Sequence, residues 1–406
     1  MTAPTYRQSL DHIAAGHAAP FSRALEEACE GLAAEVAAGD LPCLAIARQS
    51  DDLAPLAERA GAIAQQADDV LILGVGGSSL GARTLLALSD TPLTRCHLVD
   101  NVDPVTWQST LAALDPRRTH VLAVSKSGST VETMAQTVLA ADWLAAAGCP
   151  LGGASLTAIT EPGRRPLRDF ALDHGGTIFD HDAGIGGRYA VLSCVGLLPA
   201  LLGGLDAAAV RQGAAGVLET VLREGPASAP ARGAALAVHL DHGFGLSTHA
   251  MVVYADRLAT LGHWYAQLWA ESLGKAGKGS TPVVARGVTD QHSQLQLWID
   301  GPRDKWLTVI GTPAAGTGPA FGELAGLDYL AGHTLGDLME AERQATVDSL
   351  AAAGVPVRTM TVETVDERAL GALFMHFMIE TILAGRLMEV DPFGQPAVED
   401  GKRRAR

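Results

Sequence analysis

Residues 119–148 read "THVLAVSKSGSTVETMAQTVLAADWLAAAG", and they pass directly from an apolar run into a helical pattern. The segment 119–126 has the composition of a short buried strand, and 129–148 repeats apolar side chains at helical spacing. A polar turn rich in hydroxyls lies between them: Ser125, Ser127, Gly128, Ser129 and Thr130. The stretch therefore predicts one β-α unit with a polar turn at the carboxyl end of its strand.

The same alternation extends on both sides of this unit. Three further strand-like runs each precede a helical pattern, in the pairs 69–76 with 78–90, 95–101 with 103–115, and 154–160 with 165–175. Repeated β-α units of this kind predict an α/β fold, in which helices cover both faces of a parallel sheet.

The pattern changes near residue 205, where two helices, 205–224 and 229–243, follow one another without a strand. Alternation then resumes, with strand-like runs at 248–256, 293–300, 305–311 and 355–363 and helical patterns at 261–272, 335–353 and 366–388. We therefore expect two α/β lobes, 1–205 and 206–406, which agrees with the length of 406 residues.

Charge and composition narrow the class of protein. The formal net charge is -15, which argues against nucleic acid as a partner because phosphate backbones attract basic surfaces. Apolar runs fall short of the roughly 20 residues that a membrane helix needs, and the N-terminus does not resemble a signal peptide. We expect a cytoplasmic protein that binds no membrane. The five cysteines have no C-x-x-C spacing, which predicts reduced thiols rather than disulfides or a zinc site.

A second polar turn follows the strand-like run at 69–76. The segment "LILGVGGSSLG", residues 71–81, places Gly77 and Ser78 between a strand and a helix, without a dinucleotide or P-loop motif. Ligands of open α/β sheets bind beyond the carboxyl ends of strands, and helix N-termini favour anions. Two such turns predict a small phosphorylated ligand. Helix capping, as by Ser129 with Glu132, and tight helix packing explain the same residues without a ligand.

Four further segments contain side chains that suit acid/base or electrostatic chemistry. They are "GIGGRYAVLSCVG" at 184–196, "QLWAESLGKAGKG" at 267–279, "TDQHSQLQLW" at 289–298 and "DPFGQPAVEDGK" at 391–402. The candidates in them are Arg188, Gln267, Glu271, His292, Gln395 and Lys402. Taken singly, each has an ordinary structural interpretation, such as an ion pair or a solvated surface charge. Gln267 and Glu271 are four residues apart, so they share one helix face.

Taken together and in this order, the segments resemble the phosphoglucose isomerase family from about residue 70 to the C-terminus. The family's phosphate loops are similar to "GVGGSSLG" and "SKSGSTVET", its glutamate segment to "QLWAESLGK", and its histidine segment to "HSQLQ". Its two signatures are similar to "GGRYAVLSCVG" and "FGQPAVEDGK". The chain departs from these signatures at Ala190, Gly394 and Ala397. None of these departures removes a catalytic group, although the last two affect the loop that places Lys402.

The resemblance implies two flavodoxin-like lobes of the sugar-isomerase (SIS) type and an aldose–ketose isomerase of glycolysis and gluconeogenesis. The family interconverts glucose 6-phosphate and fructose 6-phosphate through ring opening and a cis-enediol. The resemblance assigns ring opening to His292 with Lys402, proton transfer to Glu271, and stabilisation of the enediolate to Arg188. It also implies contacts to phosphate or sugar by Gly77, Ser78, Ser125, Lys126, Ser127, Thr130, Gln267 and Gln395.

The resemblance further implies a homodimer in which His292 completes the partner's site. We expect no metal and no other cofactor, because the reaction moves a proton and transfers no electrons. The acidic segment Asp180–Asp182 lacks the spaced helical ligands of a zinc motif. Two alternatives stay open: an isomerase for another sugar phosphate such as mannose 6-phosphate, and a regulator that only binds sugar phosphates. The acidic charge and the full set of catalytic groups argue against the regulator.

Overall fold

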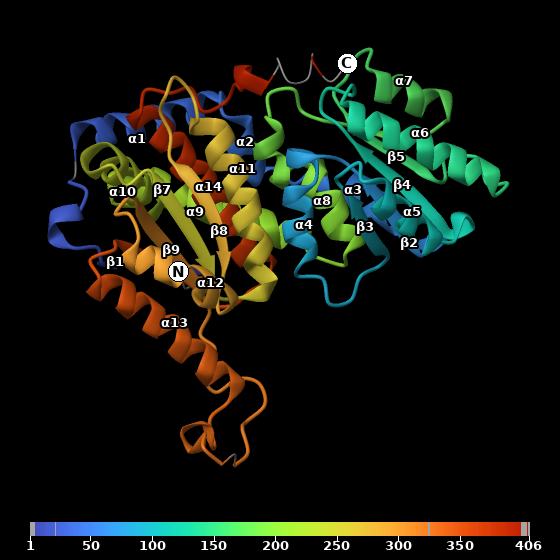
Figure 1. Cartoon of the computed structure of the whole chain (residues 1–406). Coiled ribbons are helices and arrows are strands. Elements are labelled where there is room, and N and C mark those ends of the chain that lie inside the picture. The colour runs from blue at the N-terminus through green and yellow to red at the C-terminus, as the bar shows by residue number, and fades with distance from the viewer. Residues whose placement is uncertain (1–4, 21, 324, 399–403, 405–406) are drawn as a thin grey trace. The chain divides into compact units, whose positions relative to one another are not determined.

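The computed structural model describes residues 5–20, 22–323, 325–398 and 404 (Figure 1). The chain divides into two compact units. The middle unit is Glu35–Gly216, and the terminal unit combines Met1–Ala34 with Val217–Arg406. The domain boundary near residue 205 stays a prediction. The compact units divide the chain at other places, after Ala34 and after Gly216. The first residues belong with the second half of the chain, because their strand pairs with β10.

The sheet of the middle unit has five parallel strands in the order β3-β2-β4-β5-β6. Their bounds are β2 Asp69–Leu73, β3 Arg95–Val99, β4 Thr119–Val124, β5 Leu156–Thr160 and β6 Thr177–Asp180. Numbered along the chain, this order is 2-1-3-4-5, that of flavodoxin-like folds, so the predicted α/β fold is confirmed. The direction of connection reverses between β2 and β4, which makes this pair the switch point of the sheet.

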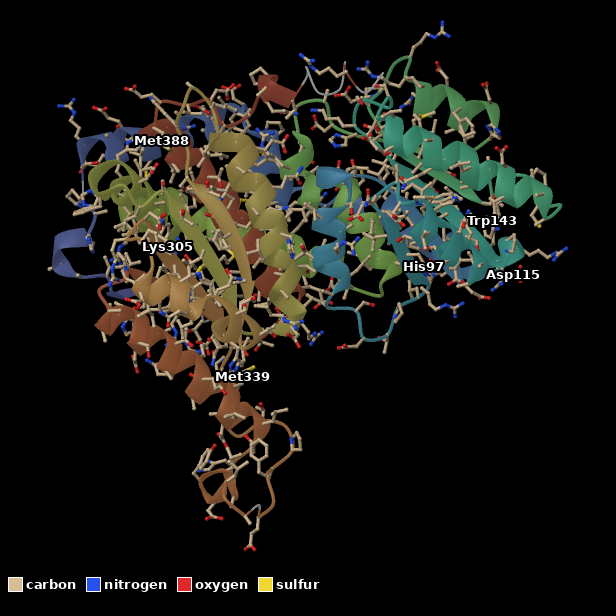
Figure 2. The ribbon with its side chains drawn as sticks, viewed as in Figure 1. His97, Asp115, Trp143, Lys305, Met339 and Met388 are labelled. Atoms are coloured by element: carbon tan, nitrogen blue, oxygen red, sulfur yellow. The ribbon has the colours of Figure 1, made fainter. Side chains whose placement is uncertain are left out.

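Helices cover both faces of this sheet (Figure 1). On one face, α5 (Pro104–Ala112), α6 (Val131–Ala146) and α7 (Pro166–Asp173) pack on buried residues such as Leu71 and Val121. Trp143 of α6, labelled in Figure 2, packs against this cluster. On the other face lie α3 (Leu53–Gln66), α4 (Leu80–Leu86) and α8 (Cys194–Leu202). Strand β4 is buried along its whole length, as expected for a strand covered on both sides.

The sheet of the terminal unit has the order β1-β10-β9-β7-β8. Its strands are β1 Tyr6–His12, β7 Thr248–Val253, β8 Thr281–Arg286, β9 Lys305–Gly311 and β10 Val357–Val362. The four parallel strands repeat the arrangement of the middle unit, with the switch point between β7 and β9. The fifth strand, β1, is antiparallel to β10 and occupies the edge of the sheet.

Helices α10 (Ala229–Phe244), α11 (Ala259–Leu273) and α14 (Glu367–Leu387) pack together in the terminal unit. Two further helices, α12 (Thr289–Asp300) and α13 (Leu335–Ala352), contribute Trp298 and Leu350 to a second cluster. Helix α14 is long and apolar enough to cross a membrane, but 89% of its most apolar window is buried inside the unit. That burial is typical of a core helix. Helices α1 (Arg23–Ala38) and α9 (Ala207–Glu224) include residues of both units.

The strand predicted at 293–300 is wrong, because these residues form most of α12. Polar and apolar residues alternate in "SQLQLWID", which imitates the pattern of a strand. In the structure Leu295, Trp298 and Ile299 pack on the second cluster, at the spacing of one helical face. Leu297 is left 54% exposed. The strand that does occupy this sheet edge is β8, which the sequence did not reveal because it is short and contains Pro282.

Candidate active site

The first polar turn follows β2 and packs closely against another loop of the middle unit. Gly76 has a φ of 59°, in the left-handed region that favours glycine. At Gly77, a Cβ atom would lie 2.3 Å from the carbonyl carbon of Gly187. Only glycine therefore lets this turn touch the segment that contains Arg188. Ser79 is buried and donates to Asp100 at 3.0 Å, which leaves Ser78 as the serine of this turn at its partly exposed surface.

The second polar turn follows β4, the strand next to β2 in the sheet. Its hydroxyls contact one another: Ser125 Oγ donates to Thr130 Oγ1 at 2.9 Å, and Ser127 Oγ accepts from the backbone N–H of Ser129 at 3.2 Å. Gly128, with a φ of 64°, makes the reversal possible. Helix α6 begins after Thr130, whose side chain makes no capping hydrogen bond. The predicted cap by Ser129 is therefore wrong, because the N-cap position of this helix is Thr130.

Arg188 lies in the short 3-10 helix Gly187–Leu192, next to the first turn. Its side chain is buried, with a relative exposure of 3%, and its guanidinium carbon lies 5.4 Å from the centre of the Tyr189 ring. The guanidinium group of an arginine is always charged in proteins. The switch point of the middle sheet thus combines two glycine- and hydroxyl-rich turns with one fixed positive charge.

Lys126 belongs to the second turn, but its ammonium group contacts a different loop. Its Nζ donates to the carbonyl of Ala183 at 2.8 Å and to that of Ile185 at 2.9 Å. Glu161 Oε1 lies 3.7 Å from the same nitrogen. The predicted contact of this side chain with phosphate stays a prediction.

Two residues that the sequence analysis missed support the second turn. Arg165, at the start of α7, donates to Glu161 at 2.7 Å. The Cβ of Arg165 lies so close to Gly128 that a methyl group there would come within 2.7 Å of it. The charged stretch "EPGRRP" at 161–166, which follows the next strand of the same sheet, is the signal that could have pointed to this edge.

In the terminal unit, Gln267 and Glu271 lie on one face of α11, as predicted from their spacing. Gln267 Nε2 donates to Glu271 Oε2 at 3.0 Å. The Oε1 atom of Gln267 is buried and has no hydrogen-bond partner, which is costly unless a ligand supplies a donor. Helix α11 runs from the carboxyl end of β7 back to the amino end of β8 (Figure 1). Glu271 lies in the last turn of this helix, Ala259–Leu273, and therefore at the amino edge of this sheet.

Gln395 is partly buried in the segment that follows α14. The loop after α11 is tied to this segment: Lys278 Nζ donates to the carbonyl of Met388 at 2.7 Å, and Lys275 Nζ donates to that of Asp391. Met388 is labelled in Figure 2. These bonds connect the end of the glutamate helix with the chain that leads to Gln395. Lys402 lies outside the described residues.

His292 lies on the first turn of α12, where its side chain is exposed. This helix starts at the carboxyl end of β8, whereas Glu271 lies at the amino end of the same strand. Helix α11, with 15 residues, spans about 22 Å between these edges. The fold of this chain therefore separates the start of α12, which carries His292, from the end of α11, which carries Glu271 (Figure 1).

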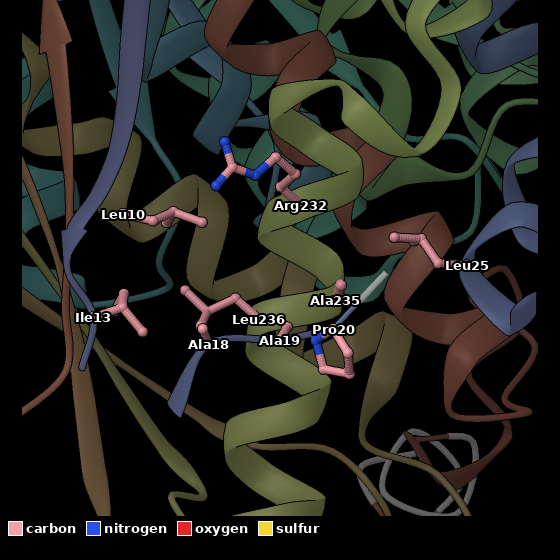
Figure 3. A pocket seen from close by; sticks show the side chains of 9 residues that line it. All are labelled: Leu10, Ile13, Ala18, Ala19, Pro20, Leu25, Arg232, Ala235 and Leu236. Carbon is pink, nitrogen blue, oxygen red and sulfur yellow. The ribbon is translucent and has the colours of Figure 1, made fainter. Parts of the chain in front are cut away.

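Among the described residues, no group of three histidine, cysteine, aspartate or glutamate side chains is arranged to hold a metal ion. Within the segment Asp180–Asp182, His181 contacts the carbonyl of Asp182 through Nδ1 at 2.9 Å, and burial lowers the pKa of its imidazole. Figure 3 shows a pocket of about 150 Å³ between α10 and the N-terminal residues. Its lining is apolar except for Arg232 and includes none of the predicted site residues.

Comparison with known proteins adds independent findings. A family model described as phosphoglucose isomerase matches residues 53–291. The chain is similar to glucose-6-phosphate isomerase of Rubrobacter xylanophilus, with 39% identity over 83% of this chain and 81% of that protein. It is also similar to glucose-6-phosphate isomerase of Thermus thermophilus, with 40% identity over 82% of each.

Solved structures give the same result for the fold. A crystal structure of a hypothetical protein from Thermus thermophilus superposes with a TM-score of 0.87 and 38% identity, over 94% of this chain and 93% of that one. A glucose-6-phosphate isomerase from Chlamydia trachomatis superposes with a TM-score of 0.82 over 100% of this chain and 88% of that one. At 20% identity the latter match shows the fold alone.

Proposed function

The chain belongs to the phosphoglucose isomerase family, and from this premise we propose how its residues interconvert glucose 6-phosphate and fructose 6-phosphate. The enzyme is an aldose–ketose isomerase, and its reaction is a step of glycolysis and gluconeogenesis. The sugar ring opens, a proton leaves carbon 2, and the proton is returned to carbon 1 of a cis-enediol(ate). The substrate must therefore be held by its phosphate while groups at the other end move protons.

The phosphate binds at the switch point of the middle sheet. The contacts come from Ser78 and the backbone of Gly77 in the first turn, and from Ser125, Ser127 and Thr130 in the second. The observation that carries this proposal is that both turns leave adjacent strands, with α6 starting at the second turn without a side-chain cap. Hydroxyls and helix N–H groups suit a dianion, and they let a chain with net charge -15 bind one.

Arg188 stabilises the negative charge that develops on the enediolate oxygens. Its buried position and its contact with the first turn support this role, because a fixed charge needs no reorganisation as the transition state forms. A lysine would be a poorer choice, since its compact and strongly hydrated charge is costlier to bury.

Glu271 transfers the proton between carbon 2 and carbon 1. One carboxylate can perform both transfers, because the two carbons are adjacent and present the same face. The hydrogen bond from Gln267 fixes the carboxylate, and the unpaired Oε1 of Gln267 can accept a bond from a sugar hydroxyl. Gln395, whose segment is tied to the loop after α11, binds a second part of the sugar.

His292 opens the sugar ring, assisted by Lys402, and it acts in the site of a partner subunit. The separation of His292 from Glu271 within one protomer supports this arrangement, because ring opening and proton transfer occur on the same substrate. The active form is then a homodimer, in which each protomer is incomplete alone.

The experiment that tests the function is a coupled assay of the purified chain with fructose 6-phosphate, in the presence of a metal chelator. Glucose 6-phosphate should form and be oxidised by an added dehydrogenase, and the chelator should leave the rate unchanged. A rate that depends on an added metal ion would contradict the proton-transfer mechanism.

The cytoplasmic location stays a proposal, supported by the burial of α14 in its unit.

A further inference from the structure

The loop that precedes Arg188 is held from two sides by the two phosphate turns. Its residues Asp182–Ile185 form a tight turn, in which the N–H groups of Gly184 and Ile185 bond to the side chain and the carbonyl of Asp182 at 2.7 and 3.1 Å. From one side, the backbone of Gly77 touches Gly187. From the other side, the ammonium of Lys126 binds the carbonyls of Ala183 and Ile185.

The ammonium of Lys126 already has partners for two of its three donors. A lysine side chain has three N–H donors. Two point to the carbonyls at 2.8 and 2.9 Å, and Glu161 Oε1 lies 3.7 Å away. Glu161 also pairs with Arg165 at 2.7 Å, so this carboxylate is shared by two cations. Moving Lys126 to a phosphate would break both carbonyl contacts.

We propose that Lys126 is a positioning residue that holds the loop before Arg188, and thereby the guanidinium, in the geometry that catalysis needs. The side chain starts in the phosphate turn and ends on the arginine loop. It thus links the grip on the substrate's phosphate with the placement of the charge that stabilises the enediolate. This inference rests on the proposed role of Arg188.

The expected effect follows from the geometry of preorganised charges. Only two residues separate Ile185 from Arg188, so loss of both carbonyl contacts lets the loop shift. A displacement on the order of 1 Å at a catalytic group costs up to about 10²-fold in rate. The phosphate contacts of Ser127 and Thr130 do not involve the ammonium, so binding of the ground state should change little.

The test compares K126M with a matched control, R59M. Arg59 also donates to two backbone carbonyls, Gly153 and Leu156, both at 3.2 Å, but at the amino end of β5, opposite the phosphate turns. We expect K126M to lower kcat about 10- to 100-fold, with less than about a threefold change in the Kd of glucitol 6-phosphate. This probe carries the phosphate but has no carbonyl to isomerise. R59M should keep the normal kcat.

A double-mutant cycle with Arg188 separates positioning from general damage. If Lys126 acts through Arg188, adding K126M to R188A should lower kcat no further. If the two residues acted independently, their fold-losses in kcat would multiply. K126Q keeps one donor group for a carbonyl and should lose less activity than K126M.

Three results would overturn the inference. One is a large rise in the Kd of glucitol 6-phosphate with unchanged kcat, which would make Lys126 a phosphate ligand. Another is a double variant of K126M and R188A whose loss of kcat equals the product of the two single losses. The third is full activity of K126M, which would leave the proposed function intact. An inactive unsubstituted chain would instead overturn the proposed function and this inference together.

Discussion

The four parallel strands of the terminal sheet repeat the order of the middle sheet, but the candidate site residues lie at opposite edges of the two sheets. In the middle unit, the carboxyl edge at β2 and β4 carries glycine- and hydroxyl-rich turns next to Arg188. In the terminal unit, Glu271 lies at the amino edge. The topology alone would place a ligand at the carboxyl edge of both sheets.

The carboxyl edge of the terminal sheet is hollowed but differently built. A pocket of about 560 Å³ lies there, lined by residues that include Arg286, Thr317 and Glu342. Two of its polar lining residues, Tyr254 and Glu342, make hydrogen bonds within the protein. Tyr254 donates to Gln291 Oε1 at 2.6 Å, and the amide nitrogen of Gln291 donates to Glu342. In the proposed site, the turn sequence rather than the strand order therefore distinguishes the edge that binds the phosphate.

The largest expected effect is at the amino edge of the terminal sheet. E271Q keeps the size and the hydrogen-bonding shape of the side chain but removes its basicity, so kcat should fall about 10²–10⁴-fold. The Kd of glucitol 6-phosphate should stay near that of the unsubstituted chain, as measured by calorimetry. E30Q, which changes an exposed glutamate of α1, is the matched control. A near-normal kcat of E271Q would show that Glu271, at this edge, does not transfer the proton.

The second prediction uses the separation of His292 from Glu271. E271Q and H292A should each be nearly inactive as homodimers. When the two are unfolded, mixed and refolded, half of the dimers are mixed, and one of the two sites in each mixed dimer is intact if His292 acts in the partner's site. Activity should then recover to about a quarter of normal. If His292 acted within its own protomer, both sites of the mixed dimer would be broken and activity would not recover.

The third prediction contrasts the carboxyl edges of the two sheets. S127A removes a hydroxyl from the second phosphate turn, and hydrogen bonds to charged groups are worth about 1.5–3 kcal/mol, so KM should rise about tenfold or more. T317A removes a hydroxyl from the pocket of the terminal sheet, where Thr317 Oγ1 donates to Ala314 at 2.6 Å. It should leave KM unchanged. A rise of KM in T317A but not in S127A would reverse the assignment of the edges.

The sequence predicted most of the fold where local pattern and tertiary packing agree. The unit at 119–148 became β4 and α6, because the strand is buried on both faces and the helix packs Ala140 and Leu144 into the core cluster. Prediction failed where pairing is distant or the pattern is ambiguous. Strand β1 depends on β10, more than 340 residues away in the chain, and α12 shares its alternation of polar and apolar residues with a strand.

For the candidate site, residue types were easier to predict than contacts. The turns at Gly77 and Ser125 were recognisable as polar turns between a strand and a helix, because glycine and hydroxyls cluster there in the sequence. The direction of the Lys126 side chain was not, since its carbonyl partners at 183 and 185 carry no signal in their side chains. Backbone acceptors are the same for every residue, so no sequence pattern marks them.

The smallest expected effect on turnover concerns the terminal unit's buried ion pair. Arg358 and Glu380 are fully buried and 2.7 Å apart, whereas Asp52 in the Arg211–Asp52 pair of the middle unit is 39% exposed. Burial alone would raise the pKa of Glu380, but Arg358 and His376 lower it from 4.5 to about 2. A depressed pKa means that the folded state holds the ionised carboxylate more strongly than the unfolded chain does. Its contribution to stability is therefore present above pH 4.5 and is lost as the pH falls toward 2.

Urea unfolding between pH 7 and pH 3 should separate the two pairs. In E380Q the free energy of unfolding should be lower at pH 7 by about 3–5 kcal/mol, because a buried arginine loses its partner. Its decline below pH 4.5 should also be shallower than in the unsubstituted chain, since the titrating group is gone. D52N should lower the free energy of unfolding at pH 7 by less than E380Q does, because the Asp52 carboxylate is 39% exposed to water. Folded E380Q should have a normal kcat at pH 7, because Glu380 has no proposed role in binding or catalysis. An acid profile of E380Q parallel to that of the unsubstituted chain would assign the pH dependence to other groups, among them the middle unit's Asp69, which pairs with Arg95 and His97.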